Sequence, residues 1–466
     1  MSVNQSHSRL NAAHFRFVIE IMKTPMSLLP RRQFIRNTAW LAGGAAFAGP
    51  LIRAVRAGEP GPNSKLRLGV VGCGGMGQGD LECFLDNQEV ECVVIADLDE
   101  ANLSKGLAIC EKKERKRPDT VKDFRRVLDR KDVDIVLIAT PDHWHAIPTV
   151  MACQAGKDVY VEKPLAKTID EGRAMLTAAQ RHNRIVQMGS QWRSCQHMID
   201  AAEFVKSGKL GKLAMARGWA YLDWLPSIGK PADCPPPAGI DYDMWLGPAP
   251  KHAFNANRFH FNFRWFWDYA GGLMTDWGVH LLNMIFMGTP PEAPQSVVSS
   301  GGKYVLDDNS ETPDSQITTY EFPTYMLVWE HKAGLGAGIN NRPWGVAWYG
   351  TEGTIMMNDA GWEVIPEKRK ANLDPEKHKS SGNPRPAHVR NFLDCVKSRE
   401  QPRLNLERGH HVSTAAHLGN IAYRTGSKIT WDAEKERVVG NKDADKLVSV
   451  EYRKPWKLDY MRRKQS

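Results

Sequence analysis

The feature that most constrains the fold is a glycine-rich loop that directly follows a short apolar stretch. Residues 66–72, LRLGVVG, are typical of a buried parallel strand, and the following residues have the pattern G-x-G-x-x-G. In such a loop Gly72 permits the tight turn, Gly74 lets the backbone approach a pyrophosphate, and Gly77 lets a helix pack on the strand. The phosphates would lie at the N-terminus of that helix. The loop residues predicted to bind a cofactor are Gly72, Gly74, Gly75, Met76 and Gly77.

A second predicted strand strengthens the interpretation of the loop as a dinucleotide site. Residues 90–97, VECVVIAD, end at Asp97, twenty residues after Gly77. An acidic side chain at this place accepts a hydrogen bond from the ribose 2′-hydroxyl of the adenosine and repels a 2′-phosphate. The sequence therefore predicts NAD as the cofactor, with NADP less favoured.

Strands and helices continue to alternate up to about residue 190. Further strands are predicted in residues 134–141, 158–164 and 185–191, and helices in residues 120–133, 145–156 and 168–183. This alternation indicates a doubly wound parallel sheet, in which ligands bind at the carboxyl ends of the strands. Those ends are Gly72, Asp97, Thr140, the Glu162–Lys163 pair and Gln191.

At this point the chain resembles the Gfo/Idh/MocA oxidoreductase family. The resemblance is carried by GCGGMG, ATPDHWHA (residues 139–146) and EKP (residues 162–164), and it covers essentially everything after residue 64. It implies a Rossmann domain whose Lys163 lies between nicotinamide and substrate. It also implies that the nicotinamide side of the cofactor is bordered by Thr140, Pro141 and His145. With Glu162 and Gln191, these complete the expected cofactor-binding set.

The second half of the chain has a different pattern, with more proline and aromatic residues after Trp192. Strands of a largely antiparallel sheet are predicted in residues 316–322, 325–332, 345–359 and 361–368, and closing helices in residues 385–398 and 408–426. The resemblance likewise implies a C-terminal α/β domain with a large, mostly antiparallel open sheet, often used for oligomer contacts. The expected division is a signal segment over residues 1–57, an NAD-binding Rossmann domain over 58–190, and a C-terminal domain for substrate binding and oligomerisation over 191–466.

One apolar stretch, GGLMTDWGVHLLNMIFMG (residues 271–288), carries a polar stripe. Asp276, His280 and Asn283 are spaced i, i+4 and i+7, which places them on one face of a helix. Since the other faces are apolar, the stripe points into a cleft or a buried polar network. The family has D-x-x-x-H here, which implies that His280 accepts the proton of the substrate hydroxyl. Many members continue to a second aspartate, and Asn283 departs from that pattern.

The expected chemistry is hydride transfer from a sugar, sugar derivative or cyclitol. The hydroxyl proton needs an acceptor and the developing alkoxide needs a positive charge. His280 is expected to accept the proton, Lys163 to polarise the oxygen, and Asp276 to orient His280 or a hydroxyl. Arg193 and Arg264 are expected to join Lys163, Asp276 and His280 in binding the substrate.

Two local patterns keep alternatives open. Phe259, Phe261, Phe263, Trp265 and Trp267 alternate as on a half-buried strand, which predicts core packing, with stacking against a sugar as the functional alternative. His143 and His145, together with His280, raise the possibility of a metal site. Their spacing is not diagnostic, so no metal is predicted.

The N-terminal segment explains most of the net charge of +9. Eight Lys and Arg and one Glu fall within residues 1–57, which accounts for +7 and leaves +2 for the rest. We therefore expect no nucleic-acid partner. RRQFIR at 31–36, a weakly apolar stretch and AVRA at 54–57 resemble a twin-arginine (Tat) export signal cleaved after Ala57. Met26 fits the start of such a signal better than Met1. The expected location is periplasmic, or membrane-tethered if the signal stays uncleaved.

Export limits the chemistry, because no pool outside the cytoplasm reoxidises NADH. The Tat pathway carries folded proteins, so the enzyme can load its nucleotide first and then keep it. Two enzyme classes remain open: an oxidoreductase with tightly held NAD, and a glycoside hydrolase or lyase that oxidises, eliminates, adds water and reduces again. A non-catalytic binding protein is the third class. The complete glycine loop, Asp97, Lys163 and His280 argue against it.

Overall fold

The computed structural model describes residues 65–369 and 372–462. The predicted export segment, including Arg31, Arg32 and Met26, lies outside the described residues. The first half forms a six-stranded sheet in the order β3-β2-β1-β4-β5-β6, and every pair in it is parallel. Its strands are β1 (Leu66–Val71), β2 (Val90–Ala96), β3 (Asp119–Val121), β4 (Ile135–Ile138), β5 (Asp158–Glu162) and β6 (Val186–Gly189).

Helices connect these strands as the sequence pattern predicts, with one correction. The connecting helices are α3 (Gly75–Leu85), α4 (Glu100–Lys112), α5 (Arg125–Leu128), α6 (Ala146–Gln154) and α7 (Ile169–Arg181). Local capping fixes their starts: Asp99 accepts from the amide of Ala101 at the start of α4, and Thr168 forms a capping box with Glu171 at α7. The helix expected over residues 120–133 is wrong, because this stretch contains the end of strand β3 followed by the one-turn helix α5.

The second half is built on a ten-stranded sheet in the order β14-β13-β12-β11-β7-β10-β9-β8-β15-β16. All of its neighbours are antiparallel except β7 and β10, which run parallel. Its strands are β7 (Leu213–Leu222), β8 (Ser296–Gly302), β9 (Ser315–Glu321), β10 (Met326–Ala333), β11 (Trp344–Gly350), β12 (Gly353–Asn358), β13 (Gly361–Pro366), β14 (Glu376–Lys379), β15 (Ile429–Asp432) and β16 (Arg437–Val439). The α/β class and the mostly antiparallel second sheet are confirmed.

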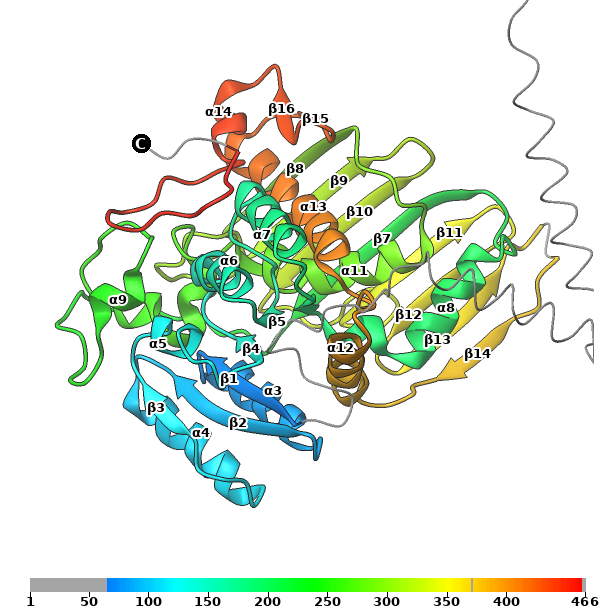
Figure 1. Cartoon of the computed structure of the whole chain (residues 1–466). Coiled ribbons are helices and arrows are strands. Elements are labelled where there is room, and N and C mark those ends of the chain that lie inside the picture. The colour runs from blue at the N-terminus through cyan, green and yellow to red at the C-terminus, as the bar shows by residue number, and fades with distance from the viewer. Residues whose placement is uncertain (1–64, 370–371, 463–466) are drawn as a thin grey trace, which may run out of the picture. The chain divides into compact units, whose positions relative to one another are not determined.

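Helices cover one face of this large sheet (Figure 1). The remaining helices are α8 (Gln196–Lys206), α9 (Tyr242–Leu246), α10 (Gly272–Asp276), α11 (Gly278–Gly288), α12 (Arg385–Ser398), α13 (Leu406–Thr425) and α14 (Lys442–Lys446). Of these, α8, α11, α13 and α14 contact strands of the sheet. Trp329 and Trp348, on the covered face, are fully buried. On the opposite face Val298, Ile317 and Met326 are 41–48% exposed.

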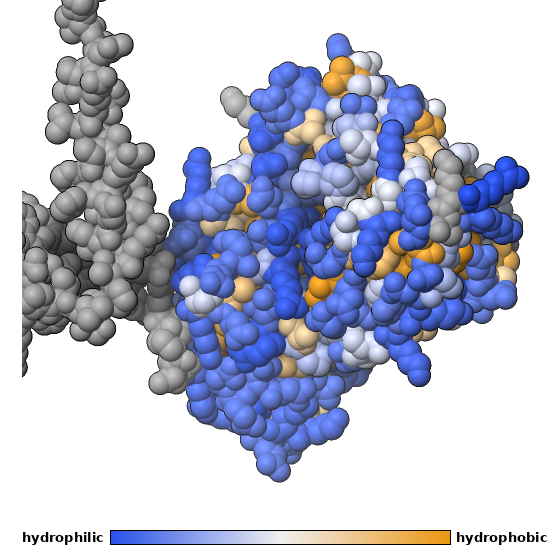
Figure 2. Space-filling view, turned by 90° about the vertical axis from the view of Figure 1, so that its right-hand side faces the viewer, coloured by the Kyte–Doolittle hydropathy of each residue, from blue (hydrophilic) through white to orange (hydrophobic). Residues whose placement is uncertain are grey.

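The surface follows this division of the chain. Figure 2 shows that the lower part of the molecule, which belongs to the first half, is almost wholly hydrophilic. Hydrophobic patches lie in its middle and upper parts. In the described part of the chain, no helix is long and apolar enough to cross a membrane. All eight cysteines are free, and all but Cys234 are buried.

Helix α12 returns from the second half to complete the core of the first. Phe392 is fully buried and meets Phe84 of α3 and Tyr160 of β5 edge-on, with ring centroids 6.0 and 5.8 Å apart. The two halves therefore share a hydrophobic cluster rather than meeting only at a cleft.

The aromatic segment before α10 is not a strand. Residues 256–265 form two short 3₁₀ helices, η4 (Ala256–Arg258) and η5 (His260–Trp265). Phe263 and Trp265 are buried, which agrees with core packing, whereas Phe261 is 51% exposed. The prediction of a strand was wrong because His260 has a left-handed backbone, with φ of 47°, which an extended strand cannot accommodate.

Candidate active site

A cavity of about 680 Å³ opens at the carboxyl ends of β1, β2, β4 and β5. Its floor is the parallel sheet, and its opposite wall comes from residues 244–264 of the second half. Among the residues expected to form the site, those that line the cavity are Gly72, Gly74, Gly75, Met76, Asp97, Thr140, Pro141, Glu162, Lys163 and Arg264. Gly77, His145, Gln191, Arg193, Asp276 and His280 do not line it.

The glycine loop has the geometry of a phosphate cradle. A Cβ at Gly74 or Gly75 would meet nothing within 4 Å, so these residues leave open space in front of the N-terminus of α3. Gly72 has φ of 86°, and a Cβ there would lie 2.8 Å from the backbone of Ala139. A Cβ at Gly77 would lie 2.3 Å from the carbonyl oxygen of Gly72, so this glycine allows the helix to pack on the strand. The loop residues therefore fit a dinucleotide.

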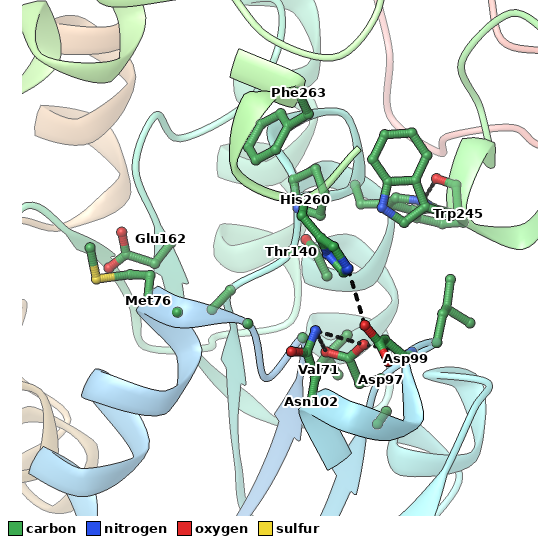
Figure 3. Close-up of a pocket in the computed structure, with 18 of the residues that line it drawn as sticks. Val71, Met76, Asp97, Asp99, Asn102, Thr140, Glu162, Trp245, His260 and Phe263 are labelled. Carbon is green, nitrogen blue, oxygen red and sulfur yellow. Dashed lines mark hydrogen bonds and ion pairs between the residues drawn. The ribbon is translucent and has the colours of Figure 1, made fainter. Parts of the chain in front are cut away.

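Asp97 lies at the end of β2, where a ribose would be bound. Its Oδ2 accepts from the amide of Cys73 at 2.7 Å, and its Oδ1 accepts from the amide of Asp99 at 2.9 Å. Burial raises the pKa of Asp97, while these amide hydrogen bonds oppose the shift. Figure 3 shows Asp97 and Asn102 side by side on one wall of the cavity. Thr140, on another wall, has a buried Oγ1 without a hydrogen-bond partner in the described part of the chain.

The centre of charge is a carboxylate between two cations. Lys163 Nζ donates to Asp276 Oδ1 and also to its carbonyl oxygen, the latter at 3.1 Å. Arg264 Nε lies 3.4 Å from the same Oδ1. Burial would raise the pKa of Asp276, but Lys163 and then Arg264 outweigh it and hold this pKa well below its usual range. Asp276 is therefore ionised and fixes the ammonium of Lys163 at the cavity wall.

A chain of hydrogen bonds leads from Arg193 to His280 across helix α11. Arg193 Nη1, which can only donate, lies 2.7 Å from Asn283 Oδ1. The amide Nδ2 of Asn283 then donates to Ser190 Oγ at 3.2 Å. Ser190 is fully buried and lies 3.0 Å from His280 Nδ1, which is the acceptor available to its hydroxyl in the described part of the chain. This arrangement favours the tautomer of His280 that carries its proton on Nε2.

His280 is neutral in this environment. Burial, followed by the charge of Lys163, lowers the pKa of His280 to about 3. Arg193 was expected to bind substrate. In the structure its Nη1 donates to Asn283 and its Nε donates to the carbonyl of Arg403 at 3.1 Å.

Two sequence profiles of one oxidoreductase family match this chain. The profile described as "Oxidoreductase family, NAD-binding Rossmann fold" matches residues 66–190. The profile described as "Oxidoreductase family, C-terminal alpha/beta domain" matches residues 214–316 and 365–458. The chain belongs to the Gfo/Idh/MocA oxidoreductase family. Its first half is an NAD-binding Rossmann domain, and its second half is the C-terminal α/β domain of this family.

Curated relatives match this chain over about a third of their length. Levoglucosan dehydrogenase of Pseudarthrobacter phenanthrenivorans is 30% identical over 137 residues, 29% of this chain and 35% of the relative. A glycosyl hydrolase family 109 protein of Shewanella sp. is 30% identical over 152 residues, 32% of this chain and 33% of the relative. The chain spans about a third of the length of these relatives.

Solved structures of the family share the fold. Levoglucosan dehydrogenase in complex with NADH and levoglucosan has a TM-score of 0.61 at 17% identity, covering 79% of this chain and 99% of that one. An aldose-aldose oxidoreductase from Caulobacter crescentus, complexed with glycerol, has a TM-score of 0.60 at 20% identity, covering 78% and 99%.

The two histidines that follow the Thr140–Pro141 pair, His143 and His145, are buried next to the cavity and do not line it. His145 is buried, with its ring nitrogens 2.7 Å from the carbonyl oxygen of Pro164 and 2.9 Å from that of Thr140. His145 was expected beside the nicotinamide. In the structure it connects the loop after β4, which contains Thr140, to the loop after β5, which contains Pro164. Burial lowers the pKa of His145 to about 4 and that of His143 to about 3. Within the described ranges, no group of three or more His, Cys, Asp or Glu could hold a metal ion.

The structure adds cavity residues that the sequence interpretation missed. Asp142, next to Pro141, lines the cavity and is 7% exposed. Burial raises the pKa of Asp142 to about 7, although the charges of Arg264 and Lys163 oppose the shift. Its position directly after the TP pair was the available signal. The other missed residues include Asp99, Asn102, Trp245, His260 and Arg385, most of them supplied by the second half. Phe259 and Phe263, expected to pack in the core or to stack against a sugar, also line the cavity.

The carboxyl of Glu162 in the EKP motif occupies space that a side chain at Gly189 would fill. A Cβ at Gly189 would lie 2.1 Å from Glu162 Oε1, so β6 can approach the carboxyl only because Gly189 has no side chain. Burial and then the neighbouring Asp80 raise the pKa of Glu162 well above its usual value. Burial also raises the pKa of Asp80 to about 6. This pair therefore retains a proton near neutrality.

Proposed function

We propose that the protein is an NAD-dependent oxidoreductase that acts on a CH–OH group of a sugar, a sugar derivative or a cyclitol. The observation that carries the proposal is that the glycine cradle, Asp97, Thr140 and Lys163 line one cavity, with Lys163 anchored from behind the cavity wall by Asp276. The levoglucosan dehydrogenase relative and the structures of sugar-binding family members support the substrate class.

Lys163 and Asp142, which line the cavity, and His280, which lies near Lys163 and Asp276, can divide the chemistry between them. NAD bound there would supply the hydride acceptor. Lys163, fixed by Asp276, holds and polarises the substrate oxygen. The helix expected over residues 271–288 is divided at Trp277, so Asp276 ends α10 while His280 belongs to α11. His280 donates from Nε2 to a substrate hydroxyl, as a neutral imidazole can. Asp142, whose pKa is raised by burial to about 7, accepts the hydroxyl proton when it is ionised.

This division changes the role expected for His280. The family resemblance implied that His280 accepts the proton of the substrate hydroxyl. Asn283 donates to Ser190 where a carboxylate would accept, and this reverses the direction of the hydrogen bonds that reach His280. Proton acceptance by Asp142 and hydrogen-bond donation by His280 fit that direction.

A second candidate is glycoside cleavage with the cofactor used internally. The specific observation that favours it is that about a third of the chain is similar to a glycosyl hydrolase family 109 protein and to an alpha-N-acetylgalactosaminidase. Oxidation of a hydroxyl to a ketone would acidify the neighbouring C–H, and loss of that proton would expel the glycosidic oxygen. Water would then add to the double bond, and return of the hydride would leave no net redox change.

One experiment separates the two candidates. The nucleotide released from the purified, denatured protein is identified by mass spectrometry, and sugars and glycosides are then screened while the reduced-nicotinamide absorbance is followed. Reduced cofactor that persists until a carbonyl compound is added indicates the oxidoreductase. Transient reduction with net glycoside cleavage indicates the second candidate. Activity in a preparation freed of all nucleotide would overturn both.

We further propose that the protein is exported by the Tat pathway to the periplasm, with NAD already bound. We also propose a homo-oligomer formed through the open face of the large sheet. The exposed apolar side chains on that face support the second proposal, since Val298, Ile317, Met326 and Ile365 are 41–48% exposed.

A further inference from the structure

Part of the cavity wall faces the adenosine end of the nucleotide site rather than the reacting end. Opposite Asp97, Asp99 and Asn102 lie side chains of the C-terminal domain, chiefly Trp245 and His260. Figure 3 shows the side chain of His260 pointing toward Asp99, and Asp97 and Asn102 lie beside Asp99. Trp245 lies on the side of His260 away from these three residues. The nucleotide site is thus bordered by both domains.

His260 is held in this position at a conformational cost. Its Nε2 lies 3.1 Å from Asp99 Oδ2, and its ring centroid is 3.9 Å from that of Phe259. Its backbone has φ of 47°, a left-handed conformation that is uncommon for residues other than glycine. Such strain persists only where surrounding contacts compensate for it, and it is concentrated at functional sites.

Both ends of this contact are anchored in rigid structure. Asp99 uses its other oxygen, Oδ1, to cap helix α4 by accepting from the amide of Ala101 at 2.8 Å. On the other side, Glu311 holds the segment by pairing with Arg258 and by accepting from the amide of Trp267 at 2.9 Å. The contact between His260 and Asp99 therefore connects the first turn after β2 to the C-terminal domain, and both residues line the cavity.

We propose that His260, together with Trp245 and Phe259, forms an outer wall of the nucleotide site, and that the contact between His260 and Asp99 closes this wall over the adenosine of NAD and retains the cofactor between turnovers. The adenosine takes no part in hydride transfer, so contacts there strengthen binding without favouring one redox state. This proposal rests on NAD binding by the Rossmann domain and not on the proposed reaction.

The test measures the dissociation rate of bound NADH, displaced by excess NAD and followed by nicotinamide fluorescence. Four variants of the full chain are compared with the parent: His260→Ala, Asp99→Asn, the double variant, and His252→Ala. Asn is also a good helix cap, so Asp99→Asn removes the charge while keeping the start of α4. His252 makes a similar pair with Asp268 at 2.6 Å on the same segment, but it does not line the cavity, which makes it the matched control.

We expect Asp99→Asn to accelerate dissociation about 3-fold, the scale of a partly exposed polar contact, and His260→Ala by on the order of 10-fold, because the ring is lost as well. The double variant should dissociate no faster than His260→Ala, and His252→Ala should match the parent. Unchanged rates in both single variants, or strictly multiplicative effects in the double variant, would overturn the proposal. Since no substrate is present, these outcomes are independent of whether the proposed reaction is correct.

Discussion

At the scale of single residues, Asp276 balances the charges of Lys163 and Arg264, the two cations that line the cavity beside it. Without its carboxylate, the ammonium of Lys163 and the guanidinium of Arg264 would lie near one another in a largely buried site. Such cations repel one another and are costly to desolvate. Asp276 therefore keeps Lys163 in place, and the cation remains available to a substrate oxygen that develops negative charge.

Substitution of this pair should separate catalysis from cofactor binding. Lys163→Met keeps the length of the side chain but removes the charge, so we expect kcat to fall by roughly 10²–10⁴-fold. Asp276→Asn should lose less, because Lys163 keeps its charge and loses only its anchor. Both variants should retain NAD. Lys105→Met, at the other end of the same cavity, is the control and should keep kcat. Equal activity of Lys163→Met and the parent would contradict the role of Lys163.

The buried carboxyl of Asp142 should make stability depend on pH. Its folded-state pKa of about 7 lies above that of the unfolded chain, so the folded state binds the extra proton between these values. The Asp142 carboxyl should thus contribute a loss of stability as pH rises from about 4 to about 7, and Asp142→Asn should lack this contribution. We expect the free energy of unfolding of Asp142→Asn, relative to wild type, to increase by about 2–3 kcal/mol between pH 5 and pH 8. Urea unfolding of the nucleotide-free protein at both pH values measures this difference, and a parallel response in the two proteins would refute it.

Asn283 should determine the tautomer of His280. In Asn283→Asp a carboxylate would accept from Ser190, whose oxygen could then accept from His280 Nδ1. We expect the proton to move from Nε2 to Nδ1 and the pKa of His280 to rise, because a negative charge is added nearby. The ¹⁵N chemical shifts of the labelled imidazole report both changes directly. Asn283→Gln, which stays neutral, is the control. Identical ¹⁵N shifts in Asn283→Asp and wild type would rule out this account of the hydrogen-bond chain.

At the scale of elements, the first domain could be predicted closely and the second only in outline. Strands β1, β2, β4, β5 and β6 are short apolar runs ended by turn residues, so periodicity identifies them. Strand β3 escaped because Asp119–Val121 has no buried residue to mark it. The aromatic alternation at residues 259–267 suggested a strand, but tertiary packing and the left-handed His260 override that local pattern. The parallel pairing of β7 with β10 joins residues more than a hundred positions apart, which no local pattern encodes.

Helix α12 shows how an element of the second domain stabilises the first. Because Phe392 is fully buried against Phe84 and Tyr160, Phe392→Ala should lower the free energy of unfolding by about 3–5 kcal/mol. The loss should appear in the Rossmann domain, as faster hydrogen exchange in β1 and β5. Arg390→Ala, on the same helix but at a partly exposed salt bridge with Glu89, should cost less than about 1 kcal/mol. Exchange in β1 and β5 that is unaffected by Phe392→Ala would show that α12 is not part of this core.

At the scale of the whole molecule, the site is assembled from both domains, and this limits what the sequence could reveal. Gly72, Asp97, Thr140 and Lys163 follow strands whose order is fixed by the fold, so their meeting was predictable. Trp245 and His260 reach the same cavity from a segment without regular alternation, and only the folded chain brings them there. The proposed closure of the nucleotide site and the proposed export agree with one another, because an exported enzyme could not replace its cofactor from a cytoplasmic pool.

The export proposal can be tested on the whole protein. Twin-arginine signals depend on the arginine pair, so Arg31→Lys with Arg32→Lys should leave uncleaved, NAD-loaded precursor in the cytoplasm. A chain that begins at Met26 should be exported at least as well as one that begins at Met1. Immunoblots of periplasmic and cytoplasmic fractions measure both, and Arg16→Lys, upstream of Met26, is the matched control that should export normally. If the double lysine variant reaches the periplasm as the parent does, the protein does not use this pathway. If the parent protein recovered from the periplasm carries no nucleotide, loading before export is also wrong, since a folded protein should carry its NAD across the membrane.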